Sequence, residues 1–276
     1  MSSPVQTIAN WLKHASASLM QAGDSTAYLD GLVMLEDIYG KDRSWLLAHT
    51  ESIISLPKLM KLNEMIIRRQ NHEPLAYIRN KTEFYGRNFY IDNRVLEPRP
   101  ESETIIDMLK GLDLPGQTTI IDIGTGSGAL AITAKLEIPH SKVVATDIDS
   151  RCLIVARKNI RKYGLDIQVF KGPLLDPLPV RQFAGNKTVL ICNLPYVPDS
   201  FKLNLAALNE PKLAIFGGLD GLEVYQKLFE QCTELKFRPK FILTESMPPQ
   251  HKKLSAIAAV NGFRLAKTND FIQLFS

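Results

Sequence analysis

The sequence predicts an α/β protein in which a small N-terminal helical domain and a β-hairpin linker precede a Rossmann-like, mostly parallel sheet. Two observations carry this prediction. From Leu96 onward, short apolar runs alternate with amphipathic segments, which is typical of strands connected by helices. The first of these runs, 119–123, ends in a glycine-rich turn, Gly124 to Gly128. Such turns occur where a parallel sheet binds a ligand at the ends of its strands.

The first part of the chain predicts a helical bundle over residues 1–73. Apolar residues recur at helical spacing in its first helix, at Ile8, Trp11, Leu12, Ala15 and Leu19. A second helix is expected between a cap at Asp24 and Gly40, and Asp42 or Ser44 can cap a third. Pro57 suits the first turn of a fourth.

Residues 74–95 are expected to form the linker, a β-hairpin whose two strands are joined at 86–88. Residues 96–276 predict the domain that carries the sheet. We expect its strands at 119–123, 142–147, 167–171, 188–192 and 240–245, with a terminal strand at 271–275. Helices should fill 101–111, 128–137, 150–163, 221–235 and 248–261.

The cysteine content favours a cytoplasmic protein, which we also expect to be a monomer. Of its 276 residues, 45% are hydrophobic and 22% charged, and no apolar run approaches a membrane span or a secretory signal. Cys152, Cys192 and Cys232 are too widely spaced for a disulfide framework or a zinc site, so no metal is expected. The net charge of +4 is small, and the basic residues of helix 150–163 are expected to be solvated. Neither membrane partners nor nucleic-acid partners are therefore expected.

The glycine turn predicts a cofactor site made by Gly124, Thr125, Gly126, Ser127 and Gly128. Alone, such a turn would also suit a dinucleotide. Two carboxylates favour S-adenosylmethionine. Asp122 precedes the turn, where it can face the ammonium of the cofactor or an ordered water. Asp147 ends the second strand, where it can accept hydrogen bonds from both ribose hydroxyls; its competing interpretation is a helix cap, for which Asp149 or Ser150 is better placed.

The tetrapeptide Asn193-Leu194-Pro195-Tyr196 follows the apolar run 188–192. A glycine turn after one strand and an (Asn/Asp)-X-Pro-(Tyr/Phe) tetrapeptide after a later one are the arrangement of S-adenosylmethionine-dependent methyltransferases that modify a planar nitrogen. The competing interpretations are an ordinary Asn-X-Pro turn and, for Tyr196, a core aromatic residue.

Several further segments resemble the protein-(glutamine-N5) methyltransferases of peptide-chain release factors, the HemK/PrmC type, over most of the chain. The first block is 73–78 together with 83–86, and the second is the Pro-Arg-Pro-Glu-Ser-Glu segment 98–103. The third is the segment 147–159. The fourth consists of Glu210-Pro211, the Gly-Gly-Leu-Asp-Gly segment 217–221 and Tyr225. The two blocks with Pro-Arg-Pro and Gly-Gly-X-Asp-Gly are more specific than the glycine turn. The sequence departs from the family pattern at three positions: Leu194 replaces the usual proline, Pro173 replaces a residue that is usually acidic, and Asn80 stands where glycine is common. Its C-terminal segment is also shorter than the usual family ending.

The resemblance implies a class I methyltransferase fold and methylation of the glutamine in a Gly-Gly-Gln loop of class-1 release factors. It implies that Asn193 and the Leu194 carbonyl accept hydrogen bonds from the glutamine amide, and that Pro195 and Tyr196 shape the slot. It adds Ile148, Leu174 and Asn193 to the cofactor residues. Pro98, Arg99 and Pro100 are expected to face the substrate; for Arg99, a surface salt bridge is the competing interpretation.

Two other functions stay open from the sequence. Asn-Leu-Pro-Tyr also resembles the tetrapeptide of ribosomal-RNA dimethyladenosine enzymes, although those place the extra domain after the methyltransferase domain. Alternatively, the departures from the family pattern would suit a cofactor-binding protein without turnover.

Overall fold

The computed structural model describes residues 6–183 and 187–276. The chain divides into two compact units. The first comprises Met1–Asn80 and a short later segment, Asn204–Asn209; the second comprises Lys81–Leu203 and Glu210–Ser276.

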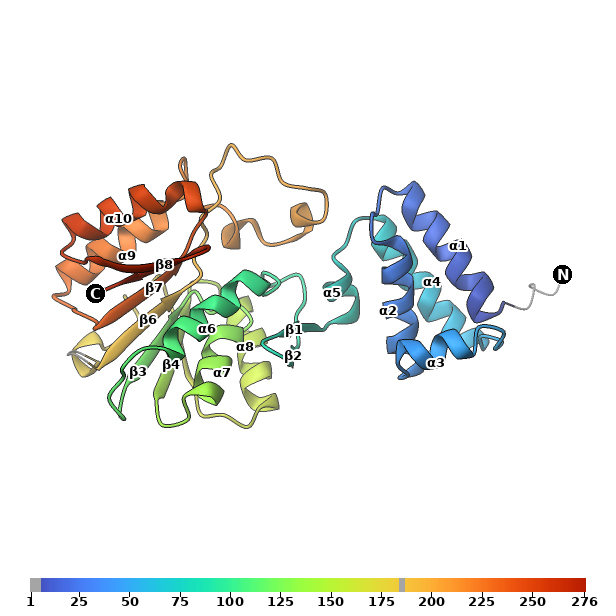
Figure 1. Cartoon of the computed structure of the whole chain (residues 1–276), viewed down its shortest axis with the longest axis horizontal. Helices are drawn as coiled ribbons and strands as arrows, with labels where there is room; N and C mark the ends of the chain where they lie inside the picture. The colour runs from blue at the N-terminus through green and yellow to red at the C-terminus, as the bar shows by residue number, and fades with distance from the viewer. Residues whose placement is uncertain (1–5, 184–186) are drawn as a thin grey trace. The chain divides into compact units, whose positions relative to one another are not determined.

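The first unit is a helical bundle (Figure 1). Its helices are α1 (Ile8–Gln21), α2 (Ala27–Tyr39), α3 (Arg43–Ala48), α4 (Leu56–Gln70) and α5 (Leu75–Arg79), and a 3-10 turn, η3 (Ala207–Asn209), comes from the later segment. Gly40 ends α2 in a left-handed conformation, and Asp42 caps α3 by accepting from the Trp45 N–H at 2.8 Å. Asp24 forms a turn before α2 instead of capping it, because its carboxylate accepts from Thr26.

The second unit begins with the hairpin of β1 (Thr82–Phe84) and β2 (Arg87–Phe89). Its turn consists of Tyr85 and Gly86, one position before the 86–88 turn that we predicted. Both residues have positive φ, +52° and +67°, as a two-residue hairpin turn requires. The Tyr85 N–H donates to the Glu103 carboxylate at 2.6 Å, which compensates for a conformation that is unusual in tyrosine.

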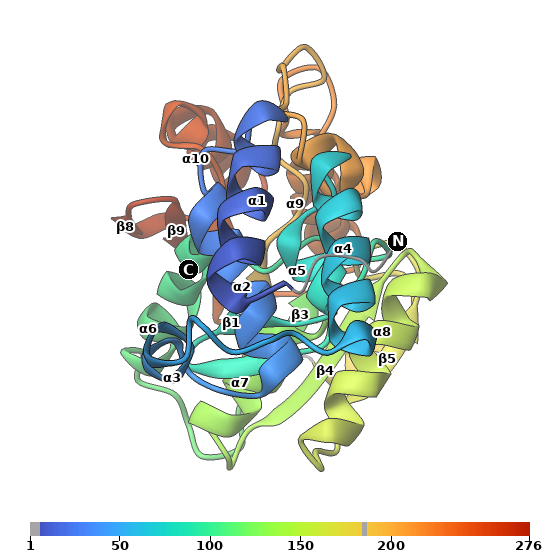
Figure 2. The same ribbon diagram turned by 90° about the vertical axis from the view of Figure 1, so that its right-hand side faces the viewer.

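The sheet of the second unit has seven strands in the order β5-β4-β3-β6-β7-β9-β8 (Figures 1 and 2). Their bounds are β3 (Thr119–Ile123), β4 (Lys142–Asp147), β5 (Gln168–Lys171), β6 (Thr188–Cys192), β7 (Phe241–Glu245), β8 (Leu265–Asn269) and β9 (Ile272–Phe275). The pairs from β5 to β7 are parallel, and β9 is antiparallel to both its neighbours. The Rossmann-like fold is confirmed, and β8 is a strand that the sequence did not predict.

Two apolar layers cover the two faces of this sheet. On one face, α6 (Glu103–Lys110), α7 (Ala129–Glu137) and α8 (Ser150–Lys162) pack on alternate strand residues such as Ile120 and Ile191. On the other, α9 (Glu223–Glu234) and α10 (His251–Val260) pack on the intervening residues, such as Ile121 and Leu190. This alternation explains why the central strands are continuous apolar runs in the sequence.

Short 3-10 turns complete the second unit: η1 (Pro100–Ser102), η2 (Val180–Gln182), η4 (Lys212–Ala214) and η5 (Pro248–Gln250). Among the described residues, no helix is both long and apolar enough to cross a bilayer.

The topology predicts where a ligand binds. The chain builds the sheet outward from β3 through β4 to β5 and then returns to place β6 on the other side of β3. A parallel sheet opens a crevice at such a switch point, at the carboxyl ends of its strands. The glycine turn follows β3 and the tetrapeptide follows β6, so both lie at this crevice.

Candidate active site

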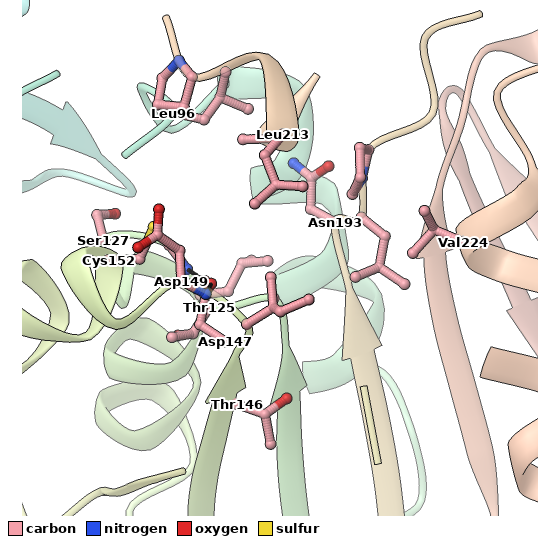
Figure 3. A pocket seen from close by; sticks show the side chains of 18 of the residues that line it. Leu96, Thr125, Ser127, Thr146, Asp147, Asp149, Cys152, Asn193, Leu213 and Val224 are labelled. Carbon is pink, nitrogen blue, oxygen red and sulfur yellow. Dashed lines mark hydrogen bonds between the residues drawn. The ribbon is translucent and has the colours of Figure 1, made fainter. Parts of the chain in front are cut away.

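A cavity of about 380 Å³ lies at the carboxyl ends of β3, β4 and β6 (Figure 3). Five segments bring predicted site residues to it: the loop before η1, the glycine turn, the end of β4, the loop after β5 and the tetrapeptide. The predicted residues that line it are Pro98, Gly124, Thr125, Gly126, Ser127, Asp147, Ile148, Leu174, Asn193, Leu194 and Pro195. Asp122, Gly128, Arg99, Pro100 and Tyr196 are not among the lining residues.

The glycine turn is held by backbone hydrogen bonds to β4. The N–H groups of Gly124 and Thr125 both donate to the Thr146 carbonyl at 2.9 Å. Gly126 has φ of +54°, and a side chain added there would meet nothing within 4 Å. At Gly124, by contrast, an added Cβ would lie 2.9 Å from Leu194 Cδ2. The turn therefore packs closely on the tetrapeptide at Gly124 and leaves open space at Gly126.

Asp122 lies inside the turn and not on the cavity wall. Its side chain is buried, and Oδ2 accepts from the Thr125 hydroxyl at 2.6 Å and from the Ala131 N–H at 3.1 Å. Burial raises the pKa of Asp122 to about 7. These contacts join the end of β3 to the start of α7, so the carboxylate braces the glycine turn from behind.

Asp147 is placed at the cavity by the end of β4. Oδ2 accepts from the Gly126 N–H and Oδ1 accepts from the Asp149 N–H, each at 2.9 Å. Burial raises the pKa of Asp147 despite these two bonds. The cap of α8 is Asp149, which accepts from the Arg151 N–H at 2.8 Å. Asp147 therefore retains lone pairs toward the cavity, since a carboxylate can accept about four hydrogen bonds.

Three residues of the tetrapeptide, Asn193, Leu194 and Tyr196, each donate a hydrogen bond to a different partner. The Asn193 Nδ2 donates to the Ser102 hydroxyl at 2.7 Å, and the Leu194 N–H donates to the Tyr225 hydroxyl at 3.2 Å. The Tyr196 hydroxyl donates to the Glu245 carboxylate at 3.0 Å, and neither of these residues lines the cavity. Burial beside that carboxylate raises the pKa of Tyr196, so the phenol stays protonated.

Arg99 forms an ion pair with Glu210. The Glu210 carboxylate is 2% exposed and also accepts from the Glu97 N–H at 3.4 Å. Its pKa is raised because burial outweighs the attraction of Arg99. The pair joins the segment containing Pro98 to the segment that leads to Leu213, and both of these residues line the cavity.

The Gly-Gly-X-Asp-Gly block supports the tetrapeptide from the other side. A Cβ at Gly217 would lie 2.4 Å from the Pro195 carbonyl oxygen, and one at Gly221 would lie 2.0 Å from that of Tyr196. The Gln250 Nε2 donates to the same Tyr196 oxygen at 2.7 Å. The backbone of the block therefore packs directly against the backbone of the tetrapeptide, with no room for a side chain at Gly217 or Gly221. In the sequence the block marks only the resemblance, and its closely spaced glycines are the signal that could have indicated this role.

Comparisons with known proteins show the family to which the chain belongs. Residues 10–79 match the family model of the PrmC N-terminal domain, and residues 102–207 match that of the methyltransferase small domain. A release factor glutamine methyltransferase of Bacillus subtilis (strain 168) is 34% identical over 250 residues, which cover 87% of this chain and 85% of the relative. The chain belongs to the release factor glutamine methyltransferase family.

Other relatives align over similar lengths of this chain. The release factor glutamine methyltransferase of Coxiella burnetii is 29% identical, with 92% of each chain covered. A bifunctional methyltransferase of Rickettsia felis is also 29% identical, but the alignment spans 54% of that longer protein. Among solved structures, the hMettl16 catalytic domain in complex with a MAT2A 3'UTR hairpin has a TM-score of 0.53 at 16% identity, and covers 82% of this chain and 83% of that one. This last likeness shows the class I methyltransferase fold. Membership in the family makes S-adenosylmethionine the implied methyl donor.

Proposed function

We propose that the protein transfers a methyl group from S-adenosylmethionine to the side-chain amide nitrogen of the glutamine in the Gly-Gly-Gln motif of class-1 release factors. One observation carries the proposal. A single cavity joins the glycine turn and Asp147 to Asn193, Leu194 and Pro195. A cofactor group and an acceptor group that enter this cavity from its two ends would meet inside it.

The residues present fit S-adenosylmethionine. The cavity is within the usual size range of small-molecule sites. The open space over Gly126 suits a ligand that approaches the backbone closely. Asp147 offers acceptors for the ribose hydroxyls. Ile148, Leu174 and the neighbouring Pro173 offer apolar contacts for the adenine, and Asp122 supports the turn beneath.

Two acceptors at the other end suit a primary amide. In the described part of the chain, neither Asn193 Oδ1 nor the Leu194 carbonyl oxygen accepts a hydrogen bond. A glutamine amide has two N–H donors, so these two oxygens can bind both. Pro195 would bound the slot in which the amide lies.

The chemistry needs little from the protein beyond orientation. The cofactor supplies a methyl group that is already activated by its sulfonium. The amide lone pair is delocalised into the carbonyl, so Asn193 and Leu194 assist by fixing both N–H bonds and by favouring positive charge on the nitrogen. As the new N–C bond forms and the S–C bond breaks, the nitrogen becomes acidic and loses its proton without a strong base. The site accordingly works without a histidine or cysteine nucleophile.

The helical unit is proposed to dock the release factor. A lone glutamine offers too little area to specify a protein substrate, since specific interfaces bury about 800 Å² per partner. Docking on residues of the first unit, with Pro98, Arg99 and Pro100 near the substrate loop, would supply the rest. We propose that the protein acts as a monomer in the cytoplasm, where its substrate functions.

The test is methylation of a purified class-1 release factor, followed by intact-mass measurement and peptide mapping. We expect one added methyl group on the glutamine of Gly-Gly-Gln. Asn193→Ala should reduce kcat by about 10²–10³-fold, by analogy with removal of one transition-state hydrogen bond.

Two results would contradict the proposal. Methyl incorporation into ribosomal RNA and not into the release factor would identify a base methyltransferase. Cofactor binding with no transfer to either substrate would identify a binding protein without turnover.

A further inference from the structure

Glu245 is a buried carboxylate that the reaction described above does not use. It ends β7, beside the end of β6 from which the tetrapeptide begins. Its side chain is fully buried and does not line the cavity. Its two oxygens accept from two hydroxyl groups, Ser102 at 2.5 Å and Tyr196 at 3.0 Å. Burying a charge is costly, so its retention beside the site calls for an explanation.

The Ser102 contact fixes which way the Asn193 amide points. A hydroxyl has one hydrogen, and that of Ser102 is donated to Glu245. The Ser102 oxygen can therefore only accept from Asn193, so Nδ2 must face it, at 2.7 Å. Turning the amide over would bring Asn193 Oδ1 against an oxygen that has no hydrogen left to offer. The carboxylate thus leaves Oδ1, the acceptor atom, on the other side of the amide.

The backbone of Glu245 holds the next residue of the tetrapeptide. The Tyr225 hydroxyl accepts from the Glu245 N–H and from the Leu194 N–H, each at 3.2 Å. It donates to the Glu245 carbonyl at 2.6 Å, with the Cys192 carbonyl also within reach at 3.1 Å. Tyr225 is fully buried, and these bonds use all its hydrogen-bonding capacity. The backbone that carries the Leu194 carbonyl is therefore tied to the end of β7.

The structure assigns to Glu245 a positioning role in methyl transfer: through Ser102 it holds the Asn193 amide with Oδ1 toward the methyl acceptor, and through Tyr196 and Tyr225 it holds the rest of the tetrapeptide. This inference rests on the proposed function, because it takes the acceptor to be a group that donates hydrogen bonds. Glu245 acts through other residues and does not touch the substrate.

A carboxylate suits this role better than an amide. Both oxygens of Glu245 can accept, so both hydroxyl hydrogens have a partner. A glutamine in its place would present an NH2 group on one side, and either Ser102 or Tyr196 would then face a donor. If Ser102 lost its acceptor, its hydrogen could turn toward Asn193, and the amide would be free to turn over.

The test compares three variants of the full-length protein with the wild type, by kcat, KM for the release factor and Kd for the cofactor. Ser102→Ala removes the acceptor of the Asn193 Nδ2 and should lower kcat by about 10–100-fold, the scale of a misplaced catalytic group. Ser102→Thr keeps the hydroxyl and should restore kcat to within about threefold of the wild type. The Kd for the cofactor should not change in either variant.

Ser246→Ala is the matched control. Its hydroxyl is as buried as that of Ser102 and one residue from Glu245, but forms no hydrogen bond within the described residues. It should leave kcat unchanged. If Ser102→Ala keeps the kcat of Ser246→Ala, or if Ser102→Thr fails to restore it while the protein stays folded, the inference is overturned.

A second measurement separates this inference from the proposed function. The side-chain amide of Asn193 can be followed by NMR in protein with 15N-labelled asparagine, and assigned by its loss in Asn193→Asp. We expect hydrogen-exchange protection in the wild type, Ser102→Thr and Ser246→Ala, and its loss in Ser102→Ala. Equal protection in all four would overturn the inference, whether or not the release factor is methylated. An inactive wild type with the expected protection pattern would count against the proposed function alone.

Discussion

Asp147 is the residue on which affinity for the cofactor should depend most. Its carboxylate already accepts from two backbone N–H groups, of Gly126 and Asp149, and the ribose would add two more donors. In Asp147→Asn one acceptor becomes a donor and the charge is lost. Because a hydrogen bond to a charged group contributes about 1.5–3 kcal/mol, we expect Kd for S-adenosylmethionine to rise about 10–100-fold. Isothermal titration calorimetry measures this directly.

A surface carboxylate provides the control for Asp147. Asp166 is exposed in the loop before β5, and Asp166→Asn should leave the cofactor Kd unchanged. An unchanged Kd in Asp147→Asn, with the melting temperature preserved, would remove Asp147 from the cofactor site.

The sequence identified part of the cavity lining, namely the glycine turn, Asp147 and the tetrapeptide, but not the residues that orient the tetrapeptide. Glycine turns and Asn-X-Pro tetrapeptides are local patterns, so Gly126 and Asn193 could be found from their neighbours in the chain. The pairing of Ser102 with Glu245 joins residues 143 positions apart. Nothing in either local sequence predicts it, because it depends on the register that places the end of β7 beside that of β6.

At the level of elements, the Gly-Gly-X-Asp-Gly block should be as sensitive to substitution as the tetrapeptide itself. Gly221 has φ of +81°, and an added Cβ would lie 2.0 Å from the Tyr196 carbonyl oxygen. Gly221→Ala must therefore displace either the block or the tetrapeptide. We expect a loss of stability of more than about 2 kcal/mol, since strain and overpacking act together, and a large loss of kcat. Chemical denaturation and the methylation assay measure these two effects.

Gly116→Ala is a suitable comparison for Gly221→Ala. Gly116 lies in an exposed loop, and an added Cβ there would meet nothing within 4 Å. Its effect on stability should stay within about 0.5 kcal/mol. If Gly221→Ala changed stability and kcat no more than Gly116→Ala does, the block would not be packed closely against the tetrapeptide.

Elements with a strong periodic pattern were predicted well, and those without one were not. Buried strands such as β3 and β6 are mostly apolar, because helices cover both sheet faces. The edge strand β8 is exposed at all five positions, so no alternation marked it in the sequence. The hairpin turn was placed one residue late because a tyrosine, and not a glycine alone, adopts the left-handed conformation.

At the level of the whole molecule, the division into two units predicts a division of labour. Every residue that lines the cavity belongs to the second unit. A variant that lacks residues 1–80 should therefore bind S-adenosylmethionine with a Kd within about threefold of the wild type. Its KM for the release factor should rise at least about tenfold if the first unit supplies docking area.

Short peptides that contain Gly-Gly-Gln sharpen this experiment. Because a peptide cannot use the docking surface, its kcat/KM should be the same with and without residues 1–80. A release factor KM that is unaffected by the deletion would remove the docking role from the helical unit.

The return of residues Asn204–Asn209 to the helical unit bears on how such proteins can be recombined. Asn209 donates to the His72 carbonyl at 3.1 Å, so part of the first unit is encoded within the gene segment for the second. A chimera that received only residues 1–80 of a relative would pair a foreign bundle with a native loop. Grafting new substrate preference onto this scaffold therefore calls for two exchanged segments, and natural variation in the bundle should be inherited together with variation in this loop.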